Sequence, residues 1–173
     1  MNRLPALALA LALAGCATPP SGTTTISPAA ITEAQTTVAG LTKLYADIQA
    51  DFPNVAPKGT AADNQIQAAL TSAATAVAAL PALAAAADQG TKLSAIASDA
   101  TEVLNVLATI LPPGTLPSDI ALGLQAAEVI IPDLVAVAST VGTPKTGALP
   151  LTPRFAASGM TVTQARGVLA GVK

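Results

Sequence analysis

The residues of this chain that could do chemistry are few, and the most distinctive is the single cysteine, Cys16. The sequence contains no histidine. It therefore lacks the commonest general base, the commonest protein metal ligand and the Ser-His and Cys-His nucleophile pairs. No glycine-rich phosphate loop and no cluster of metal ligands is apparent either. We expect no catalytic residue, no metal site and no cofactor, and the chemistry of interest is that of Cys16.

Two pairs of carboxylates have a spacing that could hold a cation or act as acid and base. Asp47 and Asp51 are four residues apart, and Asp99 and Glu102 are three apart. At these spacings each pair shares one face of a helix. We interpret both pairs as parts of solvated polar faces.

The segment before Cys16 has the order of an export signal. A lone positive charge, Arg3, is followed by an apolar run from Leu4 to Ala14. This run is too short to span a bilayer, which requires about 20 apolar residues. Its last residues, Leu13-Ala14-Gly15-Cys16, resemble the lipobox of bacterial lipoproteins.

The resemblance implies a modified amino terminus. In bacterial lipoproteins the cysteine thiol is joined to a diacylglycerol, the preceding peptide is removed, and the new terminus is usually acylated. By this resemblance residues 1–15 are a signal peptide and Cys16 is the lipidated first residue. Ala17, where an aspartate would favour retention at the inner membrane, implies the outer membrane, with the protein facing the periplasm. Two alternatives stay open: an ordinary secretory signal cleaved nearby, and an uncleaved apolar helix whose cysteine is incidental.

The composition favours helices. Hydrophobic residues make up 51% of the chain but aromatic residues only 2%. Alanine is the best helix former, although a buried alanine contributes much less than the roughly 1.5–3 kcal/mol of a large aliphatic side chain. A single cysteine excludes an internal disulfide, so helix packing must supply the stability. We predict an all-α, alanine-rich, up-and-down four-helix bundle.

Composition also divides the chain into segments. Residues 16–27, rich in proline, threonine, serine and glycine, are interpreted as the lipidated cysteine and a flexible tether. Residues 28–142 form the predicted bundle. Residues 143–160 form a proline- and glycine-rich extended arm, and residues 161–173 a short amphipathic helix.

Within the bundle, apolar residues recur at alternating intervals of three and four, which is typical of helices with one buried stripe. The pattern predicts helices over about 28–52, 60–88, 91–111 and 118–141. The stripe positions are Ile31, Ala34, Val38, Leu41, Tyr45, Ile48 and Phe52; Ile66, Leu70, Ala73, Val77, Leu80, Ala84 and Ala87; Leu93, Ile96, Ala100, Val103, Leu107 and Ile110; and Ile120, Leu124, Ala127, Ile131, Leu134, Ala138 and Val141.

Prolines and glycines suggest where these helices bend or end. Pro81 and Pro132 are each expected to kink or break a helix, because an interior proline removes a backbone hydrogen bond. Gln89-Gly90 is expected to form the turn between the second and third helices. Glu33 lies off the first stripe and is expected to be solvated.

A stretch of 20 residues, Ala68–Ala87, carries no charge and is long enough to span a membrane. Its few large apolar residues each supply only about −0.3 to −0.6 kcal/mol of insertion free energy. Threonine, serine and Pro81 oppose them. We favour a buried bundle helix over an inserted one.

Charge is distributed unevenly along the chain. Between Cys16 and Gly142 all ten acidic residues face only three lysines, whereas the segment from Thr143 onward has four basic residues and no acid. We expect the basic arm to fold back over the acidic body, and the last helix to dock on the bundle or on a partner through four residues: Val162, Ala165, Leu169 and Val172. Anionic lipid or lipopolysaccharide is an alternative target, and four dispersed charges with one aromatic residue make nucleic acid an improbable partner.

Together these features predict a lipid-anchored, non-enzymatic structural or adaptor protein of the bacterial cell envelope, held in the membrane by its anchor and bound to an envelope protein that the sequence does not identify. The alternative is a module that binds an apolar or amphipathic ligand, or a partner helix, between its helices. A small membrane-perturbing protein is a third interpretation.

Overall fold

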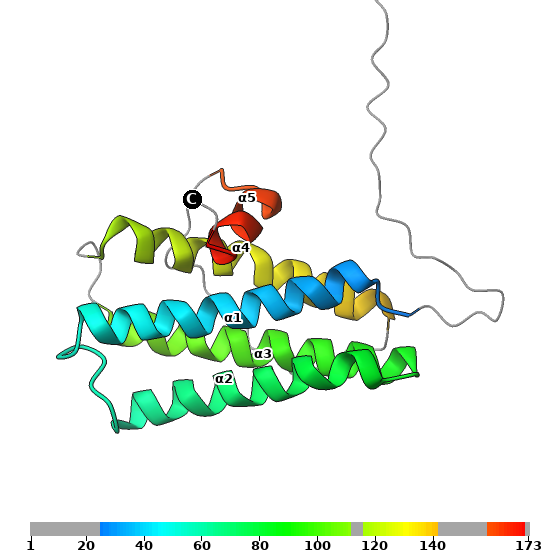
Figure 1. Ribbon diagram of the computed structural model, residues 1–173, viewed down its shortest axis with the longest axis horizontal. Coiled ribbons are helices and arrows are strands. Elements are labelled where there is room, and N and C mark those ends of the chain that lie inside the picture. The colour runs from blue at the N-terminus through cyan, green and yellow to red at the C-terminus, as the bar shows by residue number, and fades with distance from the viewer. Residues whose placement is uncertain (1–24, 112–115, 142–158, 172–173) are drawn as a thin grey trace, which may run out of the picture.

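The computed structural model describes residues 25–111, 116–141 and 159–171. These residues form five α-helices and one short 3-10 helix, without any strand. Four long helices, α1 (Pro28–Asp51), α2 (Ala61–Ala79), α3 (Ala86–Ile110) and α4 (Ser118–Val141), run alternately in opposite directions (Figure 1). The prediction of an all-α, up-and-down four-helix bundle is confirmed.

Several predicted segments lie wholly or mostly outside the described residues. They are the signal peptide 1–15 with Leu13, Ala14 and Gly15, the lipidation site Cys16, the tether up to residue 24, and most of the arm 143–160. Their assignments remain predictions.

The first two helices begin at side-chain caps. Ser27 Oγ accepts a hydrogen bond from the Ala30 backbone N–H at 3.2 Å, and Pro28 occupies the first helical position. Thr60 Oγ1 accepts from the Asp63 N–H at 3.2 Å. Such caps satisfy backbone donors that a helix start otherwise leaves free, so both starts lie where the sequence predicts them.

The apolar stripes meet in one core. Almost every stripe position is buried or half-buried, and the exceptions are Ala84 and Ala87. The largest fully buried side chains come from all four long helices: Leu41, Tyr45, Ile48, Ile66, Leu80, Leu93, Ile96, Leu104, Leu107, Ile120, Leu124 and Ile130.

The boundary between α2 and α3 differs from the prediction. Pro81 breaks the helix as expected, and a 3-10 turn, η1 (Leu80–Ala82), follows α2 directly. However, α3 already begins at Ala86, so the predicted turn at Gln89-Gly90 is wrong and both residues are helical and buried. Runs of alanine extend a helix readily, and one interior glycine costs only about 1 kcal/mol.

Pro132 has a different effect from Pro81. Helix α4 continues through it to Val141, so a break there is wrong, and the expected kink stays a prediction. Pro132 is exposed, while Ile131 and Leu134 beside it are buried. The apolar packing on either side holds the helix together despite the missing N–H.

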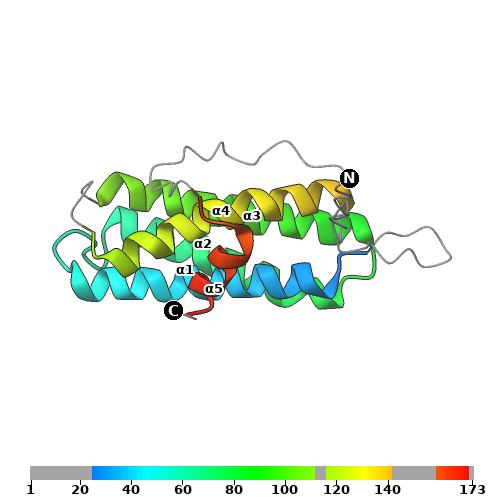
Figure 2. The ribbon, with the colours of Figure 1, turned by 90° about the horizontal axis from the view of Figure 1, so that it is seen from above.

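The short helix α5 (Val162–Leu169) lies across α1 and α4 on one side of the bundle (Figure 2). Its start is a capping box: Thr161 Oγ1 accepts from the Gln164 N–H at 3.3 Å, and the Thr161 N–H donates to Gln164 Oε1 at 2.9 Å. This double cap stabilises a helix of only eight residues. The carboxyl-terminal helix predicted from the sequence is therefore present, and it rests on the bundle.

Candidate functional site

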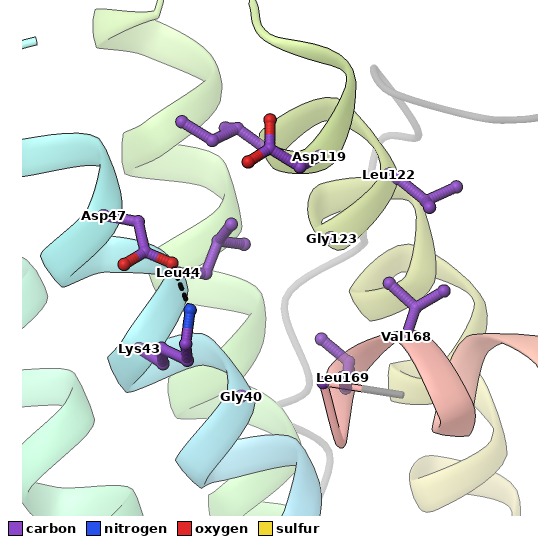
Figure 3. Close-up of a pocket in the computed structure, with 11 residues that line it drawn as sticks. Gly40, Lys43, Leu44, Asp47, Asp119, Leu122, Gly123, Val168 and Leu169 are labelled. Atoms are coloured by element: carbon purple, nitrogen blue, oxygen red, sulfur yellow. Dashed lines mark hydrogen bonds and ion pairs between the residues drawn. The ribbon is translucent and has the colours of Figure 1, made fainter. Parts of the chain in front are cut away.

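The candidate site is a groove of about 390 Å³ between α1, α4 and α5 (Figure 3). It is partly open to solvent. The residues that line it come from α1, α4 and the end of α5: Gly40, Lys43, Leu44, Asp47, Asp119, Ile120, Leu122, Gly123, Val168, Leu169 and Gly171.

Gly40 allows α1 and α5 to approach one another, and Gly123 leaves room for the Leu44 side chain. A Cβ at Gly40 would lie 2.9 Å from the Leu169 carbonyl oxygen, so α1 admits the backbone of α5 only because this position has no side chain. A Cβ at Gly123 would lie 2.9 Å from Leu44 Cδ1. Both distances are shorter than ordinary van der Waals contact. Neither glycine was identified as functional from the sequence, since a glycine inside a helical pattern does not reveal what packs against it.

The groove combines apolar walls with a charged rim. The buried part of its wall consists of Leu44, Ile120 and Leu169. Leu122 is 41% exposed, and among the described residues it is the one large apolar side chain that is exposed. Lys43 Nζ donates to Asp47 Oδ2 at 2.6 Å, and this hydrogen bond raises the pKa of Lys43. The charge of Asp119, on α4, also raises the pKa of Lys43. The arrangement can accept an apolar group and place a polar head at the rim.

The predicted docking residues of the last helix contact the bundle as follows. Ala165 and Leu169 are buried against it, and Val162 is half-buried. Val172 lies outside the described residues. The structure therefore places two of the four, Ala165 and Leu169, in the core between α5 and the bundle, and Val168, which was not predicted, packs against that core.

An ion pair adds to this contact and corrects the interpretation of Glu33. The Arg166 guanidinium donates to both Glu33 carboxylate oxygens at 2.7 Å and to Asp133 Oδ2 at 3.2 Å. The Glu33 side chain is only 6% exposed, so the expectation that it is solvated is wrong. A bidentate arginine–carboxylate pair is stronger and more specific in its geometry than a simple surface ion pair. No sequence pattern links residues 33 and 166.

The two carboxylate pairs considered from the sequence do not form sites. Asp47 is paired with Lys43 and Asp51 is exposed. Glu102 accepts from Gln65 Nε2 of α2 at 2.9 Å, and Asp99 packs near it with burial raising its pKa. Within the described ranges, no group of three potential metal-ligating side chains occurs.

A buried polar network at Asp63 was not predicted. Its carboxylate accepts from Tyr45 Oη at 2.7 Å, Gln49 Nε2 at 2.9 Å and the Gly59 N–H at 2.6 Å. These donors lower the pKa of Asp63, while burial and the neighbouring carboxylate raise the pKa of Tyr45. The network joins α1 to the start of α2. Its polar groups hydrogen-bond to one another, which is typical of structural rather than catalytic polar clusters.

Helices α3 and α4 are each long and apolar enough to cross a membrane by length and composition. About half of each apolar stretch is buried inside the bundle, 44% and 50% respectively. The uncharged stretch Ala68–Ala87 is not one continuous helix, because α2 ends at Ala79.

Comparison with known proteins adds no assignment. No protein-family model matches the chain, and neither a curated protein nor a solved structure is significantly similar to it.

Proposed function

We propose that this protein is a lipid-anchored, non-enzymatic structural or adaptor component of the bacterial cell envelope. The observation that carries the proposal is the Leu13-Ala14-Gly15-Cys16 motif behind its apolar run. The four-helix bundle supports it, since such a bundle presents long helical faces on which another protein can dock. The anchor would hold these faces close to a membrane, and the residue after the cysteine favours the outer one.

Metabolic labelling tests the anchor. Cells expressing the full chain are grown with a clickable fatty-acid analogue, and the purified protein is examined for the label and for the loss of residues 1–15. The wild-type protein should carry the label and be the shorter form, whereas Cys16→Ser should be unlabelled and remain the larger precursor. An unlabelled wild-type protein would refute the lipoprotein assignment.

The groove supports a second candidate, a module that binds an apolar or amphipathic ligand. Its volume of about 390 Å³ falls within the roughly 300–1,000 Å³ of small-molecule sites. Its position is not the one expected from the sequence, because it lies beneath α5 rather than between helices loosened by Pro81 and Pro132.

Binding of the apolar dye Nile red tests the second candidate. Leu122→Gln should weaken binding, because it replaces the exposed apolar side chain at the mouth of the groove. Ala136→Gln, at an exposed position of the same helix outside the groove, is the matched control and should not. Equal binding by both variants would remove the groove as a ligand site.

A further inference from the structure

The two ends of the bundle differ in charge. One end, here called the tether pole, consists of the start of α1, the connection 80–85 with the first turn of α3, and the end of α4 (Figure 1). The opposite end, the far pole, consists of the end of α1, the loop 52–60, the start of α2, the end of α3 and the start of α4. The tether that leads to Cys16 enters the bundle at the tether pole.

A buried glutamine fixes this point of entry. The Ile26 backbone N–H donates to Gln89 Oε1 at 2.9 Å, and Gln89 Nε2 donates to the Leu83 carbonyl oxygen at 2.8 Å. Ile26 and Gln89 are 5% and 6% exposed. The Gln89 side chain thus links Ile26, just before α1, to the connection between α2 and α3.

The 81–87 surface at this pole carries no charged residue and consists mostly of small residues. Pro81, Ala82, Ala84, Ala85 and Ala87 are exposed, and Leu83 is half-buried. The exposed Asp88, in the first turn of α3, directly follows this surface, and Lys92, of opposite sign, lies four residues further along the same helix.

Acidic side chains gather toward the far pole. The carboxylates at the surface there belong to Asp47, Asp51, Glu102 and Asp119, that of Asp63 is buried, and the described lysines among them are Lys43 and Lys58. A bilayer that contains anionic lipid repels such a surface within a Debye length of about 8–10 Å. The far pole therefore favours a position away from the membrane.

The length of the tether agrees with this arrangement. Nine residues separate Cys16 from Ile26, and a chain of that length reaches at most about 35 Å. Helix α1 has 24 residues, so at 1.5 Å per residue the bundle extends about 36 Å from pole to pole. The chain that leads to the membrane anchor thus joins the bundle at the tether pole, one helix length from the far pole.

We propose that the 81–87 surface of the tether pole rests against the headgroup region of the bilayer that holds the Cys16 lipids, and that the acidic far pole points away from it. The inference rests on the proposed lipid anchor. When alanine and proline side chains contact the headgroups, no charged group has to leave water. Contact by carboxylates would carry that desolvation cost. The contact is shallow, and the covalent lipids supply most of the affinity. The charged rim of the groove then faces the aqueous side.

Site-specific fluorescence tests this orientation. Ala84→Cys at the tether pole and Asn54→Cys at the far pole are both exposed positions, and lipid attachment blocks the native thiol. Each lipidated full-length variant is labelled with a thiol-reactive NBD fluorophore. It is then reconstituted into vesicles of phosphatidylethanolamine with a minority of phosphatidylglycerol and of lipid with a nitroxide headgroup. The label at position 84 should lose fluorescence to the nitroxide, and the label at position 54 should not.

Two further measurements separate the ways in which the proposal could fail. Flotation of the same vesicles reports anchoring: protein that does not float would refute the lipid anchor and, with it, the orientation. Protein that floats but shows equal quenching at both positions, or stronger quenching at 54, would refute the orientation alone. Ala82→Cys repeats the test at a second exposed position, and thermal unfolding followed by circular dichroism confirms that each labelled variant is folded.

Discussion

Two aspartates on the neighbouring helices α2 and α3 have opposite environments. Asp63, at the start of α2, receives hydrogen bonds from Tyr45, Gln49 and the Gly59 N–H. Asp99 lies on α3 against α2, and its Oδ2 atom is buried without a hydrogen-bond partner among the described residues. Both carboxyl groups are packed between helices, but only one meets a set of donors.

The pKa of each group follows from this difference. The Tyr45 hydroxyl, followed by the Gly59 N–H, lowers the pKa of Asp63. Burial is the main cause that raises the pKa of Asp99, and the Ser72 side chain only partly opposes it. Hydrogen bonds favour a charged carboxylate while desolvation disfavours it. Burial alone therefore does not decide whether a carboxylate stabilises this bundle, because the number of donors around it sets the sign.

Introducing a buried carboxylate that has no hydrogen-bond donor should have the largest effect on stability. Leu107→Asp places one at a position that is fully buried, and an uncompensated buried charge costs about 3–5 kcal/mol. Leu122→Asp is the matched control on an exposed leucine and should stay near about 0.5 kcal/mol. Urea or thermal unfolding measures both changes. Similar losses in the two variants would mean that the buried face of α3 is not the one described.

Asp63→Asn should have the second largest effect. Asparagine can accept from one neighbour but presents an N–H₂ group to another, so either Tyr45 or Gly59 loses its acceptor. Tyr45→Phe removes one of the same hydrogen bonds and should cost about 1 kcal/mol, less than Asp63→Asn. Chemical unfolding at neutral pH ranks the two variants, and the reverse order would contradict the network.

The pH dependence of the same variant checks the sign. The folded-state pKa of Asp63 is lowered, so its ionised form stabilises the fold above its ordinary pKa of about 3.9. The advantage of the wild-type protein over Asp63→Asn should be constant near neutral pH. It should decline as the pH falls below about 4 and through the lower folded-state value.

The sequence predicted the features that depend on local periodicity. The four stripes, the starts at Ser27 and Thr60 and the capping box at Thr161 could all be found, because each rests on residues within a few positions of one another. The beginning of α3 could not, because alanines lie on both sides of Pro81 and mark no local boundary, while Gln89 is bonded to the Ile26 N–H from a distant part of the chain.

The features of the site that involve distant residues could not be predicted. Glu33 has the spacing of a solvated residue and is covered only because α5 brings Arg166 to it from the other end of the chain. Gly40 and Gly123 matter only through the atoms of other helices. Ala165 and Leu169, by contrast, were predicted to dock from the amphipathic spacing of α5 itself.

Gly40→Ala should remove the hydrogen bonds that the Arg166 guanidinium donates to the Glu33 carboxylate. The added methyl group would lie 2.9 Å from the Leu169 carbonyl oxygen, so α5 must shift away from α1 and withdraw Arg166. Hydrogen exchange should show lost protection over Val162–Leu169 with the four long helices unchanged. Gly167→Ala is the matched control: its Cβ meets no atom within 4 Å, and alanine favours the helix by up to about 1 kcal/mol. Equal protection of α5 in both variants would contradict the close approach at Gly40.

The smallest effect, and the one of opposite sign, is expected for Asp99→Asn. The pKa of Asp99 is raised in the folded protein, so ionising this carboxyl group costs stability. That cost is absent below its unfolded pKa of about 3.9 and is complete once the pH exceeds the higher folded-state value. Asparagine does not ionise and avoids the cost. At neutral pH Asp99→Asn should therefore be as stable as the wild-type protein or slightly more stable, and this difference should vanish as the pH falls below about 4, whereas the deficit of Asp63→Asn declines over the same range. Unfolding of both variants in parallel across this range gives the comparison directly. A loss of stability in Asp99→Asn at neutral pH would show that the Oδ2 atom has a favourable partner and that the two aspartates do not differ as described.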